Sequence, residues 1–240
     1  MPWLRTSDVP MIAVNMTIKS VGQRPIKSPT LINKPISTIG TIIKAKELTS
    51  IPIHISTQAS VCNWRTAKLY QDLGAKRIVL AREVTLADAN LIKSRLNIEV
   101  ELFIHGAMCS SYSGKCTISN YTAGRDSNRG GCIQSCRHAY KIYDRENERY
   151  EGESFLMNSK DLMAVESIPS YLHYGIDAVK IEGRMKSHHY LANTVSIYRQ
   201  AIDNFKKENA TSYKNALSKV SNRGFTEGFI HDNDAQETVA

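Results

Sequence analysis

The sequence predicts an α/β fold in which helices cover a parallel sheet. Two observations support this prediction: short β-branched runs alternate with helical patterns from residue 50 onward, and the runs are apolar enough to be buried on both faces. A doubly wound sheet and a (β/α) barrel both fit this pattern, although the units are too few for eight strands. One long polar stretch, which holds four of the five cysteines, interrupts the alternation.

The first 49 residues differ from the rest of the chain. Prolines recur in them without a clear apolar period, and only residues 36–48 have the composition of a short helix or strand. We therefore expect residues 1–49 to form an atypical, weakly ordered segment. The main domain is expected to extend over residues 50–231, with a frayed tail at 232–240.

Three strands and two helices are predicted in alternation up to residue 104. Each strand is a short β-branched run, and each helix carries apolar side chains at helical spacing. Gly74 suits the end of the first helix, and Thr85 suits the N-cap of the second. In chain order these elements are residues 51–56 (strand), 60–73 (helix), 77–81 (strand), 85–95 (helix) and 98–104 (strand).

Residues 105–137 are rich in Gly, Ser, Asn and Cys and too polar for a core element, so we predict a long functional loop there. The alternation resumes beyond it. The predicted elements are a hairpin of residues 140–143 and 154–157, a helix over 161–174 that ends at Gly175, a strand over 177–181 and an amphipathic helix over 190–206.

Polar residues follow several of the predicted strands. In a barrel, the carboxyl ends of the strands form the face that carries the active site. We therefore expect four groups to converge on one rim: Ser56-Thr57-Gln58, Arg82-Glu83, His105-Gly106 and Glu182-Gly183-Arg184.

The composition narrows the classes of partner. The chain has 31 Lys and Arg against 23 Asp and Glu, a formal net charge of +8, which favours a polyanionic partner without proving one. No apolar run approaches the ~18 residues of a membrane span, and the N-terminus lacks the order of a secretory signal. We expect a cytoplasmic protein with no membrane partner.

The cysteines point to a metal site. An odd number without an export signal argues against a disulfide scaffold. Cys62 stands alone and is interpreted as structural, whereas Cys109, Cys116, Cys132 and Cys136 are separated by six, fifteen and three residues. Only the last pair has the tight spacing of structural zinc sites, and the wide intervals suit an iron–sulfur cluster. Zinc and free thiols remain alternatives.

The cysteine stretch also carries a resemblance to a known family. Residues 101–119, ELFIHGAMCSSYSGKCTIS, closely resemble the signature of peptidase family U32, the collagenase-like peptidases. The likeness continues through residues 120–132 and covers about residues 50 to 230. Its further segments are HISTQA at 54–59, AVKIEGRMK at 178–186 and VSNRGFTEGF at 220–229.

This resemblance implies a TIM-barrel-like catalytic domain with a [4Fe-4S] cluster whose ligands are Cys109, Cys116, Cys132 and Cys136. Family members are longer at both ends, so we expect an incomplete TIM-barrel-like (β/α) domain with a long cysteine-bearing loop. The branch it resembles most serves prephenate-dependent, oxygen-independent 5-hydroxylation of the wobble uridine in tRNA. This implies tRNA as partner and prephenate, a small carboxylate, as co-substrate. The alternatives are a collagenase-like peptidase and an inactive RNA-binding fragment.

Two residues near strand ends are candidate catalytic groups, His105 and Glu182. Either can move a proton, although a salt bridge with a neighbouring arginine is the alternative for Glu182 and for Glu101. For proteolysis, the only visible nucleophile–base pair is Cys109 with His105, four residues apart.

Basic residues suggest where RNA binds. Cations contact phosphates and tyrosines stack on splayed bases, whereas the alternative is that the arginines hold the loop by hydrogen bonds. Arg184 is the preferred anion binder, and its basic group suits RNA or a carboxylate substrate. The predicted binding residues are Arg125, Arg129, Lys180, Arg184 and Lys186. The stretch from Gly106 to Lys141 also contains Lys115, Arg137 and Lys141, a single acid, Asp126, and the tyrosines Tyr112, Tyr121 and Tyr140.

Overall fold

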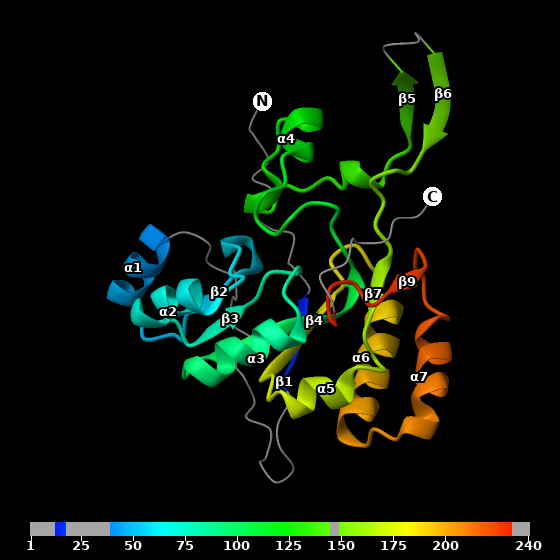
Figure 1. Ribbon diagram of the computed structural model, residues 1–240. Coiled ribbons are helices and arrows are strands. Elements are labelled where there is room, and N and C mark those ends of the chain that lie inside the picture. The colour runs from blue at the N-terminus through cyan, green and yellow to red at the C-terminus, as the bar shows by residue number, and fades with distance from the viewer. Residues whose placement is uncertain (1–12, 18–38, 145–148, 232–240) are drawn as a thin grey trace.

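The computed structural model describes residues 13–17, 39–144 and 149–231 (Figure 1). It confirms an α/β fold, because helices accompany a seven-stranded sheet whose central strands are parallel. The main path of the sheet runs β1 (Ala13–Thr17), β8 (Ala178–Glu182), β4 (Glu99–Ala107), β3 (Arg77–Val79), β2 (His54–Ile55).

Four strands of this path, β2, β3, β4 and β8, are parallel and lie in the order in which the chain makes them. Strand β1 pairs antiparallel with β8 and forms one edge, and β2 forms the other. Two short strands extend the sheet past the end of β4: β7 (Asp161–Met163) pairs antiparallel with it, and β9 (Phe225–Thr226) pairs with β7. Within the described residues the sheet is open and does not close into a barrel.

The helices begin where their capping residues permit. Asn63, Thr85 and Ser187 each accept the backbone N–H three residues ahead, which confirms Thr85 as an N-cap. Gly74, at φ +95°, follows the end of the first of these helices. Helices α2 and α3 pack side by side, as do α6 and α7 (Figure 1). The α-helices that the structure describes outside the cysteine-bearing stretch are α1 (Ile39–Leu48), α2 (Trp64–Asp72), α3 (Leu86–Arg95), α5 (Ile168–His173), α6 (His188–Asp203) and α7 (Ala210–Leu217).

A bulge in β4 decides which way its last side chains point. Residues that pair across two strands project to the same side of the sheet. Phe103 pairs with Lys180 and His105 pairs with Ile181, so β4 has one more residue than β8 between these two pairs. His105 therefore lies on the side of Ile181, which faces α6, and Phe103 lies on the other side with Lys180.

The structure corrects the predicted helix over residues 161–174. Residues Asp161–Met163 form a strand because they pair with the end of β4, and the helix is only Ile168–His173, with Pro169 in its first turn. Periodicity could not show this, since three apolar or polar residues fit either element.

The hairpin forms as β5 (Tyr140–Asp144) and β6 (Arg149–Ser154), so its second strand starts earlier than predicted. Strands β1 and β9 and helix α7 were not predicted. Of the segment predicted to be weakly ordered, the structure describes β1 and residues 39–49; its remainder and the tail at 232–240 lie outside the described residues. Among the helices that the structure describes, none has the length and apolar character needed to cross a bilayer.

Candidate functional site

The four clustered cysteines lie on residues 108–139, here called the cysteine loop, which connects β4 to β5. The loop is not structureless. It contains the short helix α4 (Ile118–Ala123) and 3-10 turns at Ser127–Arg129 and Ser135–Arg137. It starts three residues later than predicted because β4 continues through Ala107.

The first part of the cysteine loop is fixed at the ends of β2 and β3. Ser113 is 1% exposed, and its backbone N–H and hydroxyl donate to the Glu83 carboxylate at 3.2 and 3.0 Å. Its carbonyl accepts the Ser60 hydroxyl. The next residue, Gly114, has φ +73°, and a Cβ there would lie 2.4 Å from the Gln58 carbonyl oxygen. Only glycine permits this close approach.

The later part of the loop is fixed to the end of β8. The Arg184 guanidinium donates to the carbonyl of Gly130 at 3.0 Å. Gln58, Glu83 and Arg184, which follow three different strands, therefore all contact the cysteine loop, which confirms that these strand ends share one rim. For Arg184, this is the loop-holding role weighed above as the alternative to anion binding.

Hydrogen bonds from polar side chains also fix the loop internally. The Asn128 amide donates to the Cys116 carbonyl at 2.9 Å and accepts the Cys116 N–H at 3.3 Å. Hydroxyls of Thr122 and Ser135 lie 2.6 Å apart, and the Tyr140 hydroxyl donates to the Ser135 carbonyl at 2.7 Å. The backbone around the cysteines is therefore held by specific polar contacts.

The cysteine thiols differ in their surroundings. Cys132 is exposed, and Cys109, Cys116 and Cys136 are half-buried. Burial raises the pKa of Cys136, and the negative charge of Cys109 and, to a lesser extent, of Cys132 raises it further, so these three sulfurs lie within electrostatic reach of one another. Burial alone would raise the pKa of Cys116, but the polar groups near its sulfur, the Ser127 hydroxyl and the backbone N–H groups of Ile118 and Ser119, outweigh it and lower that pKa.

The chemistry of this donor set fits a thiolate-bound metal group. N–H and O–H groups aimed at a sulfur favour its thiolate form, which is the form that ligates iron and zinc. In the part of the chain that the structure describes, however, no group of three or more His, Cys, Asp or Glu side chains has an arrangement that could hold a metal ion. The ligand set therefore stays a prediction.

His105, the first candidate catalytic residue, is enclosed between β4 and α6. It is 1% exposed, its Nδ1 lies 3.2 Å from the Tyr198 hydroxyl, and the rings of Tyr190, Tyr198 and Phe225 surround it at centroid distances of 5.3 to 5.9 Å. Burial lowers the pKa of His105 to about 3, so the ring is neutral at physiological pH. Its Nε2 is buried and has no hydrogen-bond partner among the residues that the structure describes.

Glu182, the second candidate, lies on the other face of the sheet. It is half-buried at the end of β8, and its carboxylate accepts the Arg184 backbone N–H at 2.9 Å. The bulge turns His105 toward α6, and no direct contact joins the two candidates among the described residues. Both lie near Tyr190, because its ring is 5.9 Å from that of His105 and its pKa is raised by burial and by the charges of Asp161 and Glu182. Gly106 packs directly against β8, since a Cβ there would lie 2.4 Å from the Glu182 carbonyl oxygen.

Lys180, predicted to bind RNA or a carboxylate, is 7% exposed and lies 3.7 Å from the Glu101 carboxylate. Glu101 is fully buried and also pairs with Arg77 at 3.3 Å. The salt-bridge interpretation of Glu101 is therefore confirmed. Lys180 is therefore buried and already paired with a buried carboxylate.

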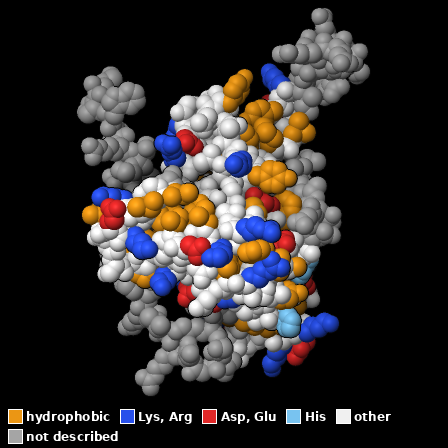
Figure 2. Space-filling model, turned by 60° about the vertical axis from the view of Figure 1, so that its left-hand side comes forward, with side chains coloured by type: hydrophobic (Ala, Val, Ile, Leu, Met, Phe, Trp, Pro, Cys, Tyr) orange, Lys and Arg blue, Asp and Glu red, His pale blue; other side chains and the backbone are white. Residues whose placement is uncertain are grey.

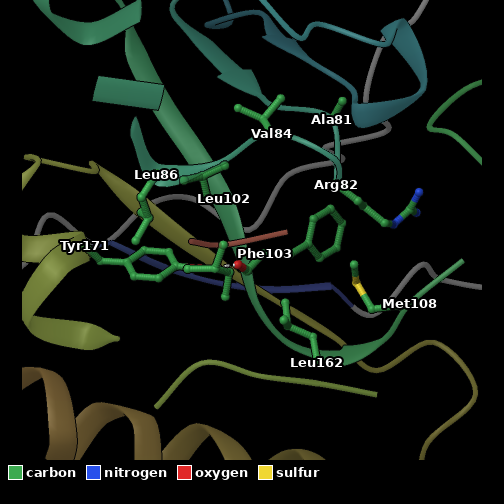
Figure 3. Close-up of a pocket in the computed structure, with 10 residues that line it drawn as sticks. Ala81, Arg82, Val84, Leu86, Leu102, Phe103, Met108, Leu162 and Tyr171 are labelled. Carbon is green, nitrogen blue, oxygen red and sulfur yellow. Dashed lines mark hydrogen bonds between the residues drawn. The ribbon is translucent and has the colours of Figure 1, made fainter. Parts of the chain in front are cut away.

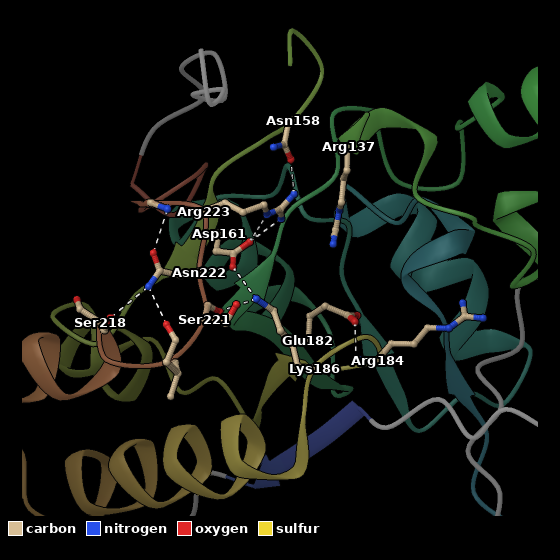
Figure 4. A network of polar contacts seen from close by, with 12 residues as sticks. Arg137, Asn158, Asp161, Glu182, Arg184, Lys186, Ser218, Ser221, Asn222 and Arg223 are labelled. Atoms are coloured by element: carbon tan, nitrogen blue, oxygen red, sulfur yellow. Dashed lines mark hydrogen bonds and ion pairs between the residues drawn. The ribbon is translucent and has the colours of Figure 1, made fainter. Parts of the chain in front are cut away.

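Figure 4 shows a buried network that the sequence did not reveal, and the charges of two of its members, Asp161 and Lys186, act on His105. Asp161 is fully buried, with Lys186 Nζ 3.2 Å from one carboxylate oxygen and the Arg223 guanidinium bonded to the other. Lys186 also donates to the Ser221 carbonyl at 2.7 Å, and Arg223 to the Asn158 side chain at 2.7 Å. Lys186, predicted to bind RNA or a carboxylate, is thus already paired.

Arg125 and Arg129, the other predicted RNA-binding residues, are exposed on the cysteine loop, and the Arg129 side chain is 84% exposed. Arg129 contacts Asp126 at 3.3 Å. Figure 2 shows basic side chains spread over one face singly and in small groups, with exposed hydrophobic side chains among them. The positive charge is therefore dispersed over this face.

The enclosed cavity under the loop is too small for a substrate. It is lined by apolar side chains that include Phe103, Met108, Leu162 and Tyr171, with Arg82 at its margin (Figure 3). Its volume of about 10 Å³ is close to the space of a single water molecule. A larger, open pocket of about 350 Å³ lies at the start of α6, beside Lys186 and Lys219.

Comparison with known proteins gives the family. Residues 35–240 match the model of peptidase family U32. The chain is 42% identical over 199 residues to tRNA hydroxylation protein P1 of Bacillus subtilis (78% of this chain, 47% of that protein). It is 37% identical over 157 residues to the 23S rRNA 5-hydroxycytidine C2501 synthase of Escherichia coli (65% and 24%). It is 28% identical over 211 residues to a collagenase of Porphyromonas gingivalis (80% and 50%).

The chain spans about half the length of the tRNA hydroxylation proteins of Bacillus subtilis and Helicobacter pylori that it matches. No solved structure is significantly similar to it. Since the family model covers most of the chain, including the cysteine loop and every strand from β2 to β9, the chain belongs to peptidase family U32.

Proposed function

We propose that this chain is an RNA-hydroxylating iron–sulfur protein of family U32. The specific reaction is prephenate-dependent, oxygen-independent 5-hydroxylation of the wobble uridine of cytoplasmic tRNA. The observation that supports it most is the cysteine loop, which three strand ends fix over one rim of the sheet while its basic side chains stay exposed. Relatives named for tRNA hydroxylation and for rRNA hydroxycytidine synthesis support the choice of RNA.

The proposed cofactor is a [4Fe-4S] cluster with Cys109, Cys116, Cys132 and Cys136 as ligands. Such a cluster supplies one-electron redox chemistry. The protein's contribution is to position and deprotonate the thiols: Ser127 and the α4 N–H groups stabilise the Cys116 thiolate, and Asn128 fixes the backbone of the same residue. In this proposal the open sheet belongs to a TIM-barrel-like domain.

Substrate contacts are assigned to the groups that the structure leaves accessible. Arg125 and Arg129 face solvent and suit RNA phosphates. Arg184 is half-buried at the rim, and one nitrogen of its guanidinium donates to the Gly130 carbonyl, so the other two suit the carboxylate of the co-substrate. Glu182, whose carboxylate accepts the Arg184 backbone N–H, is assigned as the proton-transferring group there.

Proteolysis through a Cys109–His105 pair is disfavoured by the same geometry. A cysteine nucleophile of this kind relies on a histidine that can accept its proton. His105 is enclosed by three aromatic rings, and its depressed pKa makes it a weak base. The family name and the collagenase relative therefore do not describe the chemistry that these residues support best.

Expression of the chain in bacteria that lack their own tRNA hydroxylation protein tests the proposal. We expect mass spectrometry of tRNA nucleosides to show hydroxylated uridine with the wild-type chain and none with Cys136→Ala. The matched control is Cys62→Ala, because Cys62 lies outside the loop and is exposed. Absence of hydroxylated uridine with a folded, metal-loaded wild-type chain would contradict the proposal.

A further inference from the structure

We propose that Tyr112 and Tyr121, the two exposed tyrosine side chains of the cysteine loop and here called the stacking platform, each stack on an unpaired RNA base. This inference depends on RNA being the substrate, as proposed above, and adds the residues and the kind of RNA segment that they recognise. It is carried by the exposure of the two rings, by the rigidity of the backbone below them and by the charge around them.

The two rings are unusually exposed. Tyr121 is 93% exposed and Tyr112 is 71% exposed, more than any other aromatic side chain in the described residues. Aromatic rings gain free energy when they leave water, so a folded protein that presents two of them on one loop has a use for them as contacts. Tyr140, the third tyrosine of the stretch, is different: it is half-buried and its hydroxyl is bonded to Ser135. The structure therefore excludes Tyr140 from the platform.

The backbone beside each exposed ring is fixed. Ser113 follows Tyr112 directly and is 1% exposed, bonded to Glu83 and to Ser60. Ser119, also 1% exposed, lies one half-turn before Tyr121 on α4, and its hydroxyl accepts the Ile133 N–H at 3.3 Å. A base that stacks on either ring would therefore not have to order the loop, which lowers the entropic cost of binding.

The charge of the same stretch selects a polyanion. Residues 106–141 carry five cations and one acid, Asp126, which already contacts Arg129. Arg125 lies four residues after Tyr121, and Lys115 three residues after Tyr112; both cations are exposed. Aromatic faces next to cations match single-stranded RNA, in which bases and phosphates alternate. Paired RNA hides its base faces and gains only the cationic contacts.

Binding of two fluorescently labelled RNAs tests the platform. One is an anticodon stem–loop with unpaired bases, and the other is a fully paired RNA hairpin of similar length with a minimal tetraloop. We expect Tyr121→Ala and Tyr112→Ala each to weaken binding of the stem–loop roughly tenfold, since stacking on one aromatic side chain is worth about 1–3 kcal/mol per base. Binding of the paired RNA should be unchanged, and Tyr121→Phe, which keeps the ring, should bind like the wild type.

Two controls separate stacking from charge and from general surface effects. Arg125→Ala should weaken binding of both RNAs and reduce the salt dependence of that binding. Leu48→Ala removes an apolar side chain that is 73% exposed but distant in sequence from the loop, and should change neither affinity. Equal affinity of wild type and both alanine variants for the stem–loop would overturn the platform and leave the proposed function standing. Failure of the wild-type chain to bind either RNA would instead contradict the proposed function itself.

Discussion

The central sheet and the cysteine loop are built by different physical means. In the sheet, Ile78, Val100 and Val179 are buried completely, so this region is held by apolar burial. In residues 109–139 the only buried residues are serines, Ser113, Ser119, Ser127 and Ser135, and each sits among hydrogen-bonded partners or in a turn. Burial tolerates many apolar sequences, but a hydrogen-bonded loop depends on particular donors, acceptors and glycines. The loop should therefore be more sensitive to conservative changes and open locally without unfolding the sheet.

The largest effect is expected in the sheet. Ile78→Ala removes a fully buried side chain from β3 and should lower the free energy of unfolding by about 2–5 kcal/mol, because it leaves a cavity in addition to the lost burial. Ile43→Ala changes a side chain of α1 that is 46% exposed, and it should lower the free energy of unfolding by less than about 1 kcal/mol. Urea denaturation of both variants measures this. Similar losses for the two would show that burial does not hold the sheet.

The next effect is a pH dependence that originates at His105. The ordinary pKa of histidine is 6.5, and burial lowers that of His105 to about 3 in the folded chain. The unfolded chain therefore binds a proton below pH 6.5 that the folded chain does not bind. The contribution of neutral His105 to the free energy of unfolding is fully present above pH 6.5. It is lost at about 1.4 kcal/mol per pH unit as the pH falls from 6.5 toward 3.

Urea denaturation at pH 7.0, 5.5 and 4.5 should show the wild type losing about 2–3 kcal/mol more than His105→Gln over this range. The difference between the two chains isolates His105 from the carboxylates, which titrate in both. Parallel pH profiles would mean that His105 is accessible to water, and the bulge would not enclose it as described.

A smaller effect, confined to the loop, distinguishes two glycines. Gly114 and Gly124 both have positive φ, but a Cβ on Gly114 would meet the Gln58 carbonyl oxygen at 2.4 Å, whereas a Cβ on Gly124 has nothing within 4 Å. Gly114→Ala should facilitate opening of the loop by about 2 kcal/mol, and Gly124→Ala by about 1 kcal/mol from backbone strain alone. Amide hydrogen exchange of residues 108–139 measures both. Increased exchange in β3 or β4 would contradict the independence of loop and sheet.

The smallest effect concerns the contact from β8. Arg184→Ala removes the bond to the Gly130 carbonyl and should facilitate loop opening by about 1 kcal/mol. Arg129→Ala is the control, since its exposed pair with Asp126 is worth about 0–1 kcal/mol. Limited proteolysis of the loop compares them. Identical cleavage of both variants and the wild type would show that Arg184 does not hold the loop.

Features with a local signal in the sequence could be predicted, and features that depend on distant residues could not. The parallel strands were predicted from their β-branched runs, and the start of α3 was predicted from its N-cap, Thr85, because both signals are local in the chain. The convergence of Gln58, Glu83 and Arg184 followed from the rule that parallel strands end on one rim. The β4 bulge was not predictable, because an inserted residue leaves no mark in the apolar pattern.

The buried pairs were missed for a related reason. Asp161 and Arg223 are 62 residues apart, and no spacing rule links them. The burial of Lys180 depends equally on a distant residue, Glu101 on the neighbouring strand. Contacts of this kind require the register of the sheet, which periodicity does not give.

The most direct test of the account is metal analysis of the chain purified without oxygen. Iron, acid-labile sulfide and zinc are measured together with the absorption spectrum for the wild type, for Cys132→Ala and Cys136→Ala, and for Cys62→Ala as control. We predict about four irons and four sulfides per chain in the wild type and in Cys62→Ala, and loss of the cluster from both loop variants. Zinc in place of iron, or a folded chain without metal, would contradict the central claim that the loop holds a redox cluster.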